Sequence, residues 1–156
     1  PDYIDCYKVS FSDEKNLVTP TVLCKNFFTS GPKWMEVLFE FRERVAKLVG
    51  LKTGDKISDR QKALDEFNCE VGQQLSLFKV FEKTNSEVIM GEDDKHLNFR
   101  ISIYLEEGEG REKILTLSTT VQFNNWFGKL YFLPVKPFHK LIVPSMMKGM
   151  VRNSMS

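Results

Sequence analysis

The sequence predicts an α+β fold in which a curved antiparallel sheet grips a kinked C-terminal helix. Two observations favour this class. After residue 72, short segments alternate apolar and polar residues with tight turns between them, and the chain ends in a stretch with helical spacing. The 156 residues, 42% hydrophobic and 28% charged, are typical of one globular domain, so we expect residues 1–156 to form a single unit. A formal net charge of +1 argues against nucleic-acid binding driven by bulk charge.

The first third of the chain predicts one strand and two helices. Residues 3–11 alternate, with one face formed by Tyr3, Asp5, Tyr7, Val9 and Phe11. Thr19 can cap a short helix over about residues 21–28, because Pro20 suits the first helical position. A second, stronger helix is predicted from Pro32 to Gly50, on the apolar stripe Trp34, Leu38, Phe41, Val45 and Leu48. Residues 52–71 are polar and are interpreted as a surface excursion.

The middle of the chain predicts an antiparallel meander. The strands are expected over residues 75–82, 87–91, 97–105 and 114–123, and residues 106–112 form a glycine-rich hairpin loop. The spacing predicts that one set of side chains is buried: Trp34, Phe41, Phe99, Ile101, Ile103, Leu117 and Val121.

The C-terminal stretch predicts a helix capped by Asn124 or Asn125. Its core-facing side is expected to comprise Phe127, Leu130, Tyr131, Pro134, Phe138, Leu141, Ile142 and Met146. Three internal prolines predict a kink, or a second segment that starts at Pro137. Residues 125–156 carry five cations and no acid. We interpret them as a solvated face that complements the acidic residues 82–112; the alternative is a basic amphipathic surface for membranes or an acidic partner.

The three cysteines indicate no disulfide framework and no zinc site, because they are odd in number and widely spaced. A reducing cytoplasm is the simplest compartment for such a chain. The first nine residues lack the apolar region of a signal peptide. Residues 130–143 are apolar but too short and too interrupted to span a bilayer, so no transmembrane segment is expected.

The two histidines, His96 and His139, are the candidate general bases, together with Asp94 and Glu87. Asp94 and His96 also resemble the start of a metal site, but the other histidine lies more than 40 residues away and no ligand spacing follows. No nucleophile motif and no paired carboxylates occur. We therefore assign no catalytic residue and expect no metal or cofactor.

The chain resembles a family of uncharacterised, mostly bacterial domains that stand alone or follow an NAD-binding Rossmann domain. The matching segments are Asp2–Asp5, Phe28–Trp34, Gly50–Lys52, Glu87–Val88, Gly91, Asp94–Arg100, Ser118–Thr119, Gly128–Phe132 and Pro137–Val143. The resemblance implies the SRPBCC, or START-like, helix-grip fold, which often encloses an apolar cavity between sheet and helix. The Rossmann domain itself is not expected here, because Gly108-x-Gly110 lacks the third glycine of a dinucleotide fingerprint.

The leading functional hypothesis is a small apolar ligand bound between the sheet and the final helix. The expected lining is Trp34, Phe99, Ile101, Ile103, Leu115, Leu117, Phe127, Tyr131, Phe138 and His139, of which Tyr131 and His139 supply polar groups at the mouth. One alternative is a cyclase- or hydrolase-like enzyme in the same cavity. The other is a regulatory domain that contacts a Rossmann-type protein partner.

Overall fold

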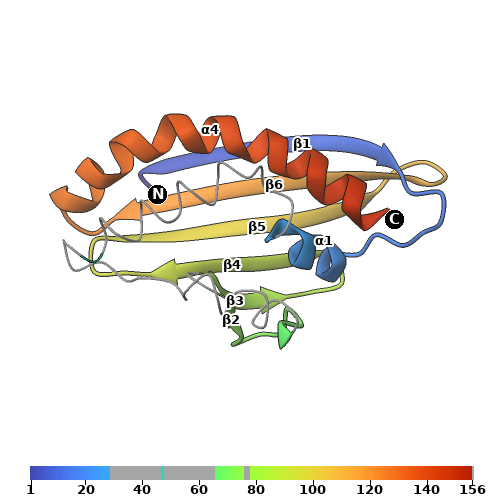
Figure 1. The fold of residues 1–156 in the computed structure, drawn as a ribbon, viewed down its shortest axis with the longest axis horizontal. Coiled ribbons are helices and arrows are strands. Elements are labelled where there is room, and N and C mark those ends of the chain that lie inside the picture. The colour runs from blue at the N-terminus through green and yellow to red at the C-terminus, as the bar shows by residue number, and fades with distance from the viewer. Residues whose placement is uncertain (29–46, 48–65, 76–77, 156) are drawn as a thin grey trace.

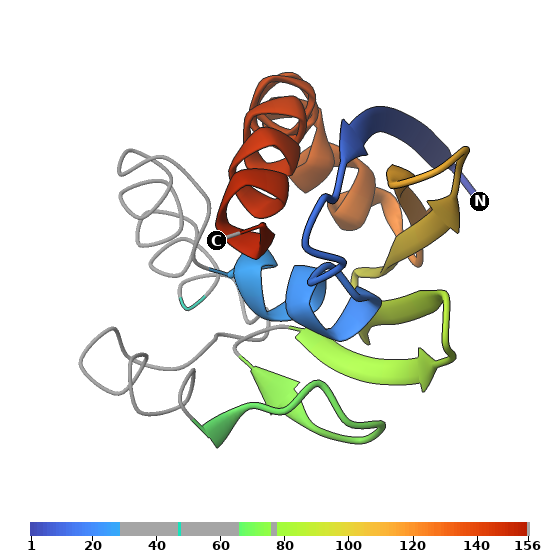
Figure 2. The ribbon, with the colours of Figure 1, turned by 90° about the vertical axis from the view of Figure 1, so that its right-hand side faces the viewer.

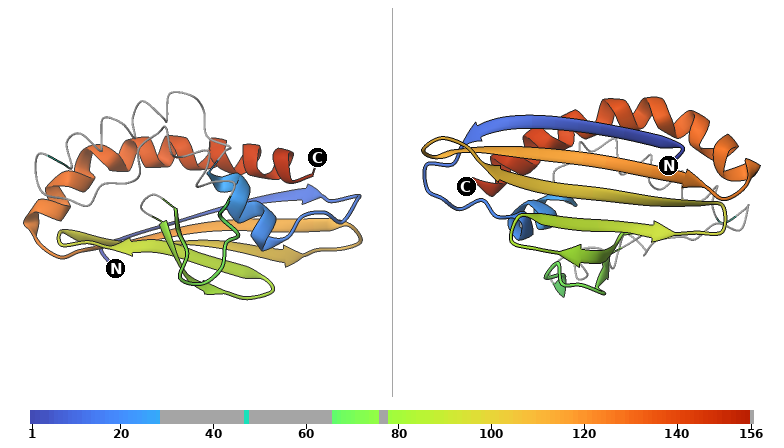
Figure 3. Two further views of the ribbon diagram at one scale, coloured as in Figure 1. Left: turned by 60° about the horizontal axis from the view of Figure 1, so that its bottom comes forward. Right: turned by 180° about the vertical axis from the view of Figure 1, so that it is seen from behind.

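The computed structural model describes residues 1–28, 47, 66–75 and 78–155. In this part of the chain, six strands form one antiparallel sheet in the order β1-β6-β5-β4-β3-β2. The helices α1 and α4 lie on one face of the sheet (Figures 1 and 2), whereas the described elements leave the other face open (Figure 3, right). The predicted fold class is confirmed: a curved antiparallel sheet holds a C-terminal helix in a helix-grip-like arrangement.

The strands follow the predicted alternation closely. Their bounds are β1 Tyr3–Ser12, β2 Gln74–Leu75, β3 Phe78–Lys83, β4 Glu87–Asp93, β5 Leu97–Glu107 and β6 Glu112–Phe123. The central pairing sets Ile103 opposite Leu117 and Phe99 opposite Val121, so the apolar rows of β5 and β6 share the helix-covered face. The register shifts between Val80 and Glu82, where a bulge interrupts β3.

Helix α1 spans Pro20–Phe27 and begins as expected. The Thr19 hydroxyl accepts a hydrogen bond from the Val22 backbone N–H at 3.2 Å, and Pro20 occupies the first position. The second predicted helix, with Trp34 and Phe41, lies outside the described residues except for Lys47, as do residues 52–65 of the predicted excursion. Of its remaining residues, Phe67 and Cys69 are buried in the core, and the surface excursion as a whole stays a prediction.

Helix α4 spans Trp126–Ser154 without interruption and contains Pro134, Pro137 and Pro144. Of the two expected alternatives, a separate segment from Pro137 does not occur, and the helix arches over the sheet as one element (Figure 3, left). The Asn125 side chain accepts a hydrogen bond from the Gly128 N–H at 3.0 Å, which satisfies one donor of the first turn. A Cβ at Gly128 would overlap the carbonyl oxygen of His96, so only glycine allows this close approach. None of the described helices is long and apolar enough to cross a membrane.

The buried side of α4 differs from the predicted stripe. The predicted core positions Leu130, Phe138 and Leu141 are 52%, 47% and 66% exposed, respectively. The predicted Met146 is buried, and the other residues that enter the core are Phe132, Val143, Met147, Met150 and Val151. Apolar side chains surround the first half of this helix on nearly every side, so periodicity alone did not identify the face that packs on the sheet.

The core combines this side of α4 with the covered face of the sheet and with α1. The predicted burial of Ile101, Ile103, Leu117 and Val121 is confirmed, and Phe99 is half-buried against the same cluster. Aromatic rings extend the core toward residues 66–75: Phe27, Phe28 and Phe78 contact one another edge to face at centroid distances of 5.1–5.4 Å.

A disulfide joins Cys24 on α1 to Cys69, and both residues are fully buried. This corrects the expectation that the cysteines form no disulfide. The odd third cysteine, Cys6, is free and lies on the exposed side of β1. Wide spacing concealed the pair, because 45 residues of sequence separate two positions that the fold brings together.

Candidate functional site

The covered face of β1 carries polar groups where α4 crosses it. Tyr3 and Asp5 occupy alternate, inward-facing positions of β1, and Thr119 of β6 lies directly opposite Asp5 on the same face. His139 reaches this point from α4, and its Nε2 lies 2.9 Å from Asp5 Oδ2. The Tyr3 hydroxyl donates a hydrogen bond to the same Asp5 oxygen at 2.8 Å. We call these four residues the Asp5 cluster.

Three buried atoms of the Asp5 cluster have no hydrogen-bond partner in the part of the chain that the structure describes. They are Asp5 Oδ1, Thr119 Oγ1 and His139 Nε2. The last of these is close to Asp5, but the ring is not oriented to donate along that contact. A buried polar atom that lacks a partner costs about 1–3 kcal/mol. Three of these atoms lie at one place, so the Asp5 cluster holds most of the unpartnered buried side-chain atoms among the described residues.

Aromatic rings form one wall of the Asp5 cluster. The Tyr3 ring packs against Phe132 at 5.0 Å and against the His139 ring at 6.1 Å, measured between centroids. Lys136 Nζ lies 5.4 Å from the Tyr3 ring centroid, where it adds a cation–π contact. The polar atoms thus lie beside aromatic surface, as in sites that bind mainly apolar molecules with one polar end.

Burial sets the protonation of two members of the cluster. Desolvation lowers the pKa of His139 below its ordinary value, and this effect outweighs the opposing attraction of the Asp5 carboxylate. Desolvation, with the hydrogen bond to Asp5 and its charge, raises the pKa of Tyr3 well above its ordinary value. At neutral pH the imidazole and the phenol are therefore both uncharged, and the phenol donates its proton to Asp5.

The structure distributes the predicted lining residues over different surroundings. Ile101, Ile103, Leu115 and Leu117 are buried on the covered face, and His139 belongs to the Asp5 cluster. Phe99 packs edge-on against Phe78 at 5.6 Å, Tyr131 is half-buried, and Phe138 is largely outward-facing. Phe127 lies at the start of α4 against the His96 ring, at 4.7 Å. Trp34 lies outside the described residues.

The other histidine, His96, makes contacts that hold two elements of the fold together. The His96 ring Nδ1 lies 2.8 Å from Asn125 Nδ2, and Asp94 accepts a hydrogen bond from the His96 backbone N–H at 3.3 Å. These contacts join the β4–β5 turn to the cap of α4. Among the described residues, no three His, Cys, Asp or Glu side chains gather into a group able to hold a metal ion.

A second buried polar contact lies at the opposite end of β1. Lys113 of β6 donates to Asp13 Oδ2 at 2.7 Å, to Asn16 Oδ1 at 2.9 Å and to the Val18 carbonyl at 2.9 Å. Asp13 also accepts from the N–H groups of Val18 and Leu17. Both charges are buried and satisfied by these partners, so this ion pair fixes the β1–α1 connection rather than offering a binding site.

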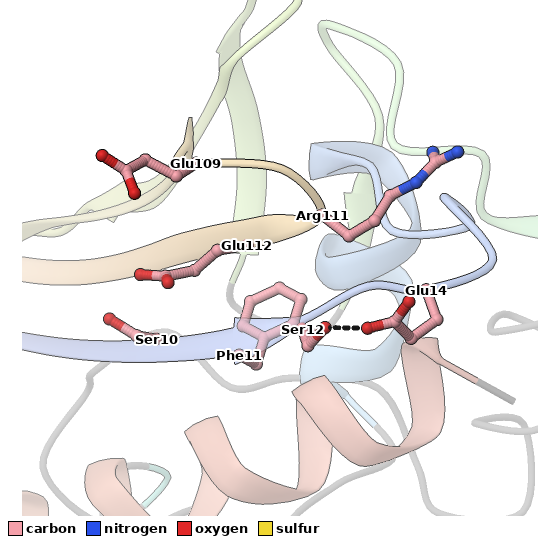
Figure 4. Close-up of a pocket in the computed structure, with 7 residues that line it drawn as sticks. All are labelled: Ser10, Phe11, Ser12, Glu14, Glu109, Arg111 and Glu112. Atoms are coloured by element: carbon pink, nitrogen blue, oxygen red, sulfur yellow. Dashed lines mark hydrogen bonds between the residues drawn. The ribbon is translucent and has the colours of Figure 1, made fainter.

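Two open hollows lie elsewhere on the described surface. Figure 4 shows one beside the end of β1, lined by Ser10, Phe11, Ser12, Glu14, Glu109, Arg111 and Glu112. The other lies on the open face of the sheet, where Arg100 stacks on Phe81 at 3.8 Å and also pairs with Asp93. The first is dominated by carboxylates, and the arginine of the second is already paired. Neither has the buried, unpartnered groups of the Asp5 cluster.

Sequence reasoning identified His139 but missed its partners. Asp5 was placed on the same strand face as Tyr3, Tyr7, Val9 and Phe11, and a carboxylate within an otherwise aromatic and apolar row is a usable signal. Lys113 lies on the same face of β6 as Leu115 and Leu117, so it is likewise a charged residue within an apolar row. The pairing of Asp5 with His139 has no local signature, because it depends on how α4 crosses β1.

The fold and these groups define an α+β protein of helix-grip-like architecture with a polar cluster enclosed between sheet and helix. The family model described as "Protein of unknown function (DUF2867)" matches residues 1–146. The chain therefore belongs to the DUF2867 family. No curated protein and no solved structure matches it.

Proposed function

We propose that the protein binds a small, largely apolar molecule between the sheet and α4, with the polar end of that molecule at the Asp5 cluster. The convergence of three buried, unpartnered polar atoms supports this proposal. The aromatic wall formed by Tyr3 and Phe132 supports an apolar body for the ligand. The helix-grip-like arrangement supports assigning the fold to the SRPBCC, or START-like, class as part of the same proposal.

The charges of the cluster restrict the polar end of the ligand. Asp5 Oδ1 accepts hydrogen bonds, whereas Thr119 Oγ1 both donates and accepts. A ligand carboxylate at this position would face the Asp5 carboxyl group among buried atoms, and like charges there repel. A hydroxyl group donates to Asp5 and accepts from Thr119, so the expected ligand is an alcohol or phenol with an apolar body. Sterols, isoprenoid alcohols and aromatic polyketides have this chemistry.

The experiment compares an isoprenoid alcohol, a sterol and an aromatic polyketide with a fatty acid of similar chain length. A bound alcohol raises Tm with its concentration, because binding to the folded state stabilises it by mass action. The fatty acid leaves Tm unchanged. If no member of the panel shifts Tm, or if the fatty acid is as effective as the alcohols, the proposal fails.

Matched threonine variants test the site itself. Thr119→Val removes the unpartnered hydroxyl, leaves the volume almost unchanged and does not lower Tm of the free protein. The variant lowers the affinity for the alcohol about fivefold, which corresponds to the loss of one hydrogen bond. Thr120→Val, one residue along and on the opposite face of β6, is the control and leaves the affinity unchanged. Equal affinities for both variants would contradict the assignment of the polar end.

A second candidate function is an enzyme of cyclase or hydrolase type that acts on the same ligand class. The 2.9 Å separation of His139 Nε2 from Asp5 Oδ2 favours it, because an imidazole and a carboxylate side by side are both groups that serve in general acid–base catalysis. Mass spectrometry of each panel compound after incubation tests for turnover, and His139→Gln abolishes any turnover of this kind. The interaction with a Rossmann-type partner stays a prediction.

A further inference from the structure

The outward side of the first half of α4 presents a continuous apolar stripe. Its members follow at spacings of four, three, four and four residues: Trp126, Leu130, Leu133, Pro137 and Leu141. Such spacings keep side chains on one face of a helix. The four large side chains among them are exposed by 74%, 52%, 61% and 66%, respectively. Phe138, beside the stripe, is also largely exposed.

Lysines line one flank of this stripe. Lys129, Lys136 and Lys140 each precede a stripe residue by one position, so they form a parallel row along the helix. All three are exposed. The whole of α4 contains no Asp or Glu to offset them. The outer surface of α4 is thus apolar along its crest and positively charged along one side.

The exposed apolar residues of α4 are not explained by packing in the core. Of the α4 side chains expected to serve the core, Met146 does so, but Leu130, Phe138 and Leu141 are exposed, and the core uses Phe132, Val143, Met147 and Met150 in their place. Five large apolar side chains on one exposed helix surface exceed what single, scattered surface residues explain. Helix α4 therefore has two apolar sides with different uses.

We propose that this surface docks the protein on an anionic lipid bilayer. An amphipathic helix lies in the membrane interface with Trp and Leu among the acyl chains and lysines near the headgroups, and the stripe and its lysine row match this arrangement. The lysine row, on a helix that contains no acid, favours a negatively charged partner, which is anionic lipid rather than a neutral bilayer surface. Trp126 at the first position of α4 suits the headgroup boundary, where aromatic side chains are enriched.

The experiment is cosedimentation with vesicles of phosphatidylcholine alone and of phosphatidylcholine mixed with phosphatidylserine. The protein sediments with the mixed vesicles at low salt, and added salt releases it, because screening weakens the attraction of the lysine row. Trp126 fluorescence shifts to the blue on binding, and Trp126→Phe removes this shift. Absence of binding to mixed vesicles, or equal binding to both compositions, would overturn the proposal.

Paired variants separate the two components of the surface. Lys129→Gln with Lys140→Gln weakens binding to mixed vesicles by about 25-fold, from about fivefold for each lysine near an anionic surface. Leu133→Ser with Leu141→Ser abolishes binding without lowering Tm, because both side chains already face solvent. The matched control is Ile4→Ser with Lys8→Glu, an exposed apolar and basic pair on the open face of the sheet, which leaves binding unchanged.

A second copy of the chain is the competing occupant of the stripe. Sedimentation of the protein without lipid measures it directly, and we expect a monomer. A dimer that Leu133→Ser with Leu141→Ser dissociates would assign the stripe to a second copy of the chain and overturn the membrane proposal.

Discussion

The ammonium group of Lys113 is buried inside the protein, where it forms an ion pair with the carboxylate of Asp13. Removing Asp13 alone leaves the ammonium group buried with only neutral partners, Asn16 and the Val18 carbonyl. We expect Asp13→Ala to reduce the free energy of unfolding by about 3–5 kcal/mol, the usual cost of breaking a buried pair. Urea denaturation measures this. The double variant Asp13→Leu with Lys113→Met removes both charges and costs less than the single variant.

The same pair gives the protein a defined sensitivity to acid. Desolvation alone would raise the pKa of Asp13, but the hydrogen bond from Lys113 and those from the Val18 and Leu17 N–H groups prevail and lower it. A carboxyl group with a lowered pKa contributes stability that is fully present above its unfolded pKa of about 3.9. That contribution is lost as the pH falls through the lower, folded value. Asp13→Ala lacks this contribution, so its stability changes less with pH in that window.

At the scale of the element, the alternation of apolar residues was a reliable guide to strands and the helical stripe was not a reliable guide to burial. Strand β5 was predicted over residues 97–105 and extends to Glu107, because pairing with β6 continues to Lys113 beyond the last apolar position. A strand offers only two faces, so one apolar row identifies the buried one. A helix with apolar residues all around has several faces that could be buried, and the way it packs on the sheet determines which face is buried.

Two alanine variants on α4 test this distinction. Met150 is fully buried and Leu141 is 66% exposed, although both are large and apolar. We expect Met150→Ala to cost about 2–5 kcal/mol because it leaves a cavity in the core. Leu141→Ala changes the stability by less than about 0.5 kcal/mol, as surface substitutions usually do. Similar losses for both variants in chemical denaturation would mean that the outer side of α4 is covered in the free protein.

At the scale of the whole molecule, the disulfide between Cys24 and Cys69 joins α1 to the segment that precedes β2. We expect one reactive thiol, that of Cys6, when the protein is denatured without reductant, and three when it is denatured with reductant. Thiol titration with mass analysis of alkylated peptides measures both values. Three reactive thiols without reductant would indicate that the pair is reduced in the purified protein. A stable bond is typical of oxidising compartments, so this result also bears on the expected cytoplasmic location.

The fold class and the covered row of each central strand were predictable because they depend on local patterns. The Asp5 cluster and the disulfide were not, because each joins positions that only the complete topology brings together. His139 reaches Asp5 across more than a hundred residues of sequence, and no spacing rule covers such a distance. The sequence did contain one signal for each of the two buried polar contacts described above, a single charged residue within an otherwise apolar row. Asp5 marks the Asp5 cluster, and Lys113 marks the ion pair with Asp13.

The pairing of β1 with β6 also governs the order in which the protein is assembled on the ribosome. Asp13 and Lys113, at one end of this pair of strands, are 100 residues apart in the sequence. Strand β1 therefore emerges early, yet its hydrogen-bonding neighbour among the described strands is β6, which follows the other five in the sequence. Until then its aromatic row and backbone groups are unpaired, which is when strands are most prone to aggregate. Strands β3 to β5 are able to pair during synthesis, whereas closing the loop between β1 and β6 comes last and slows folding.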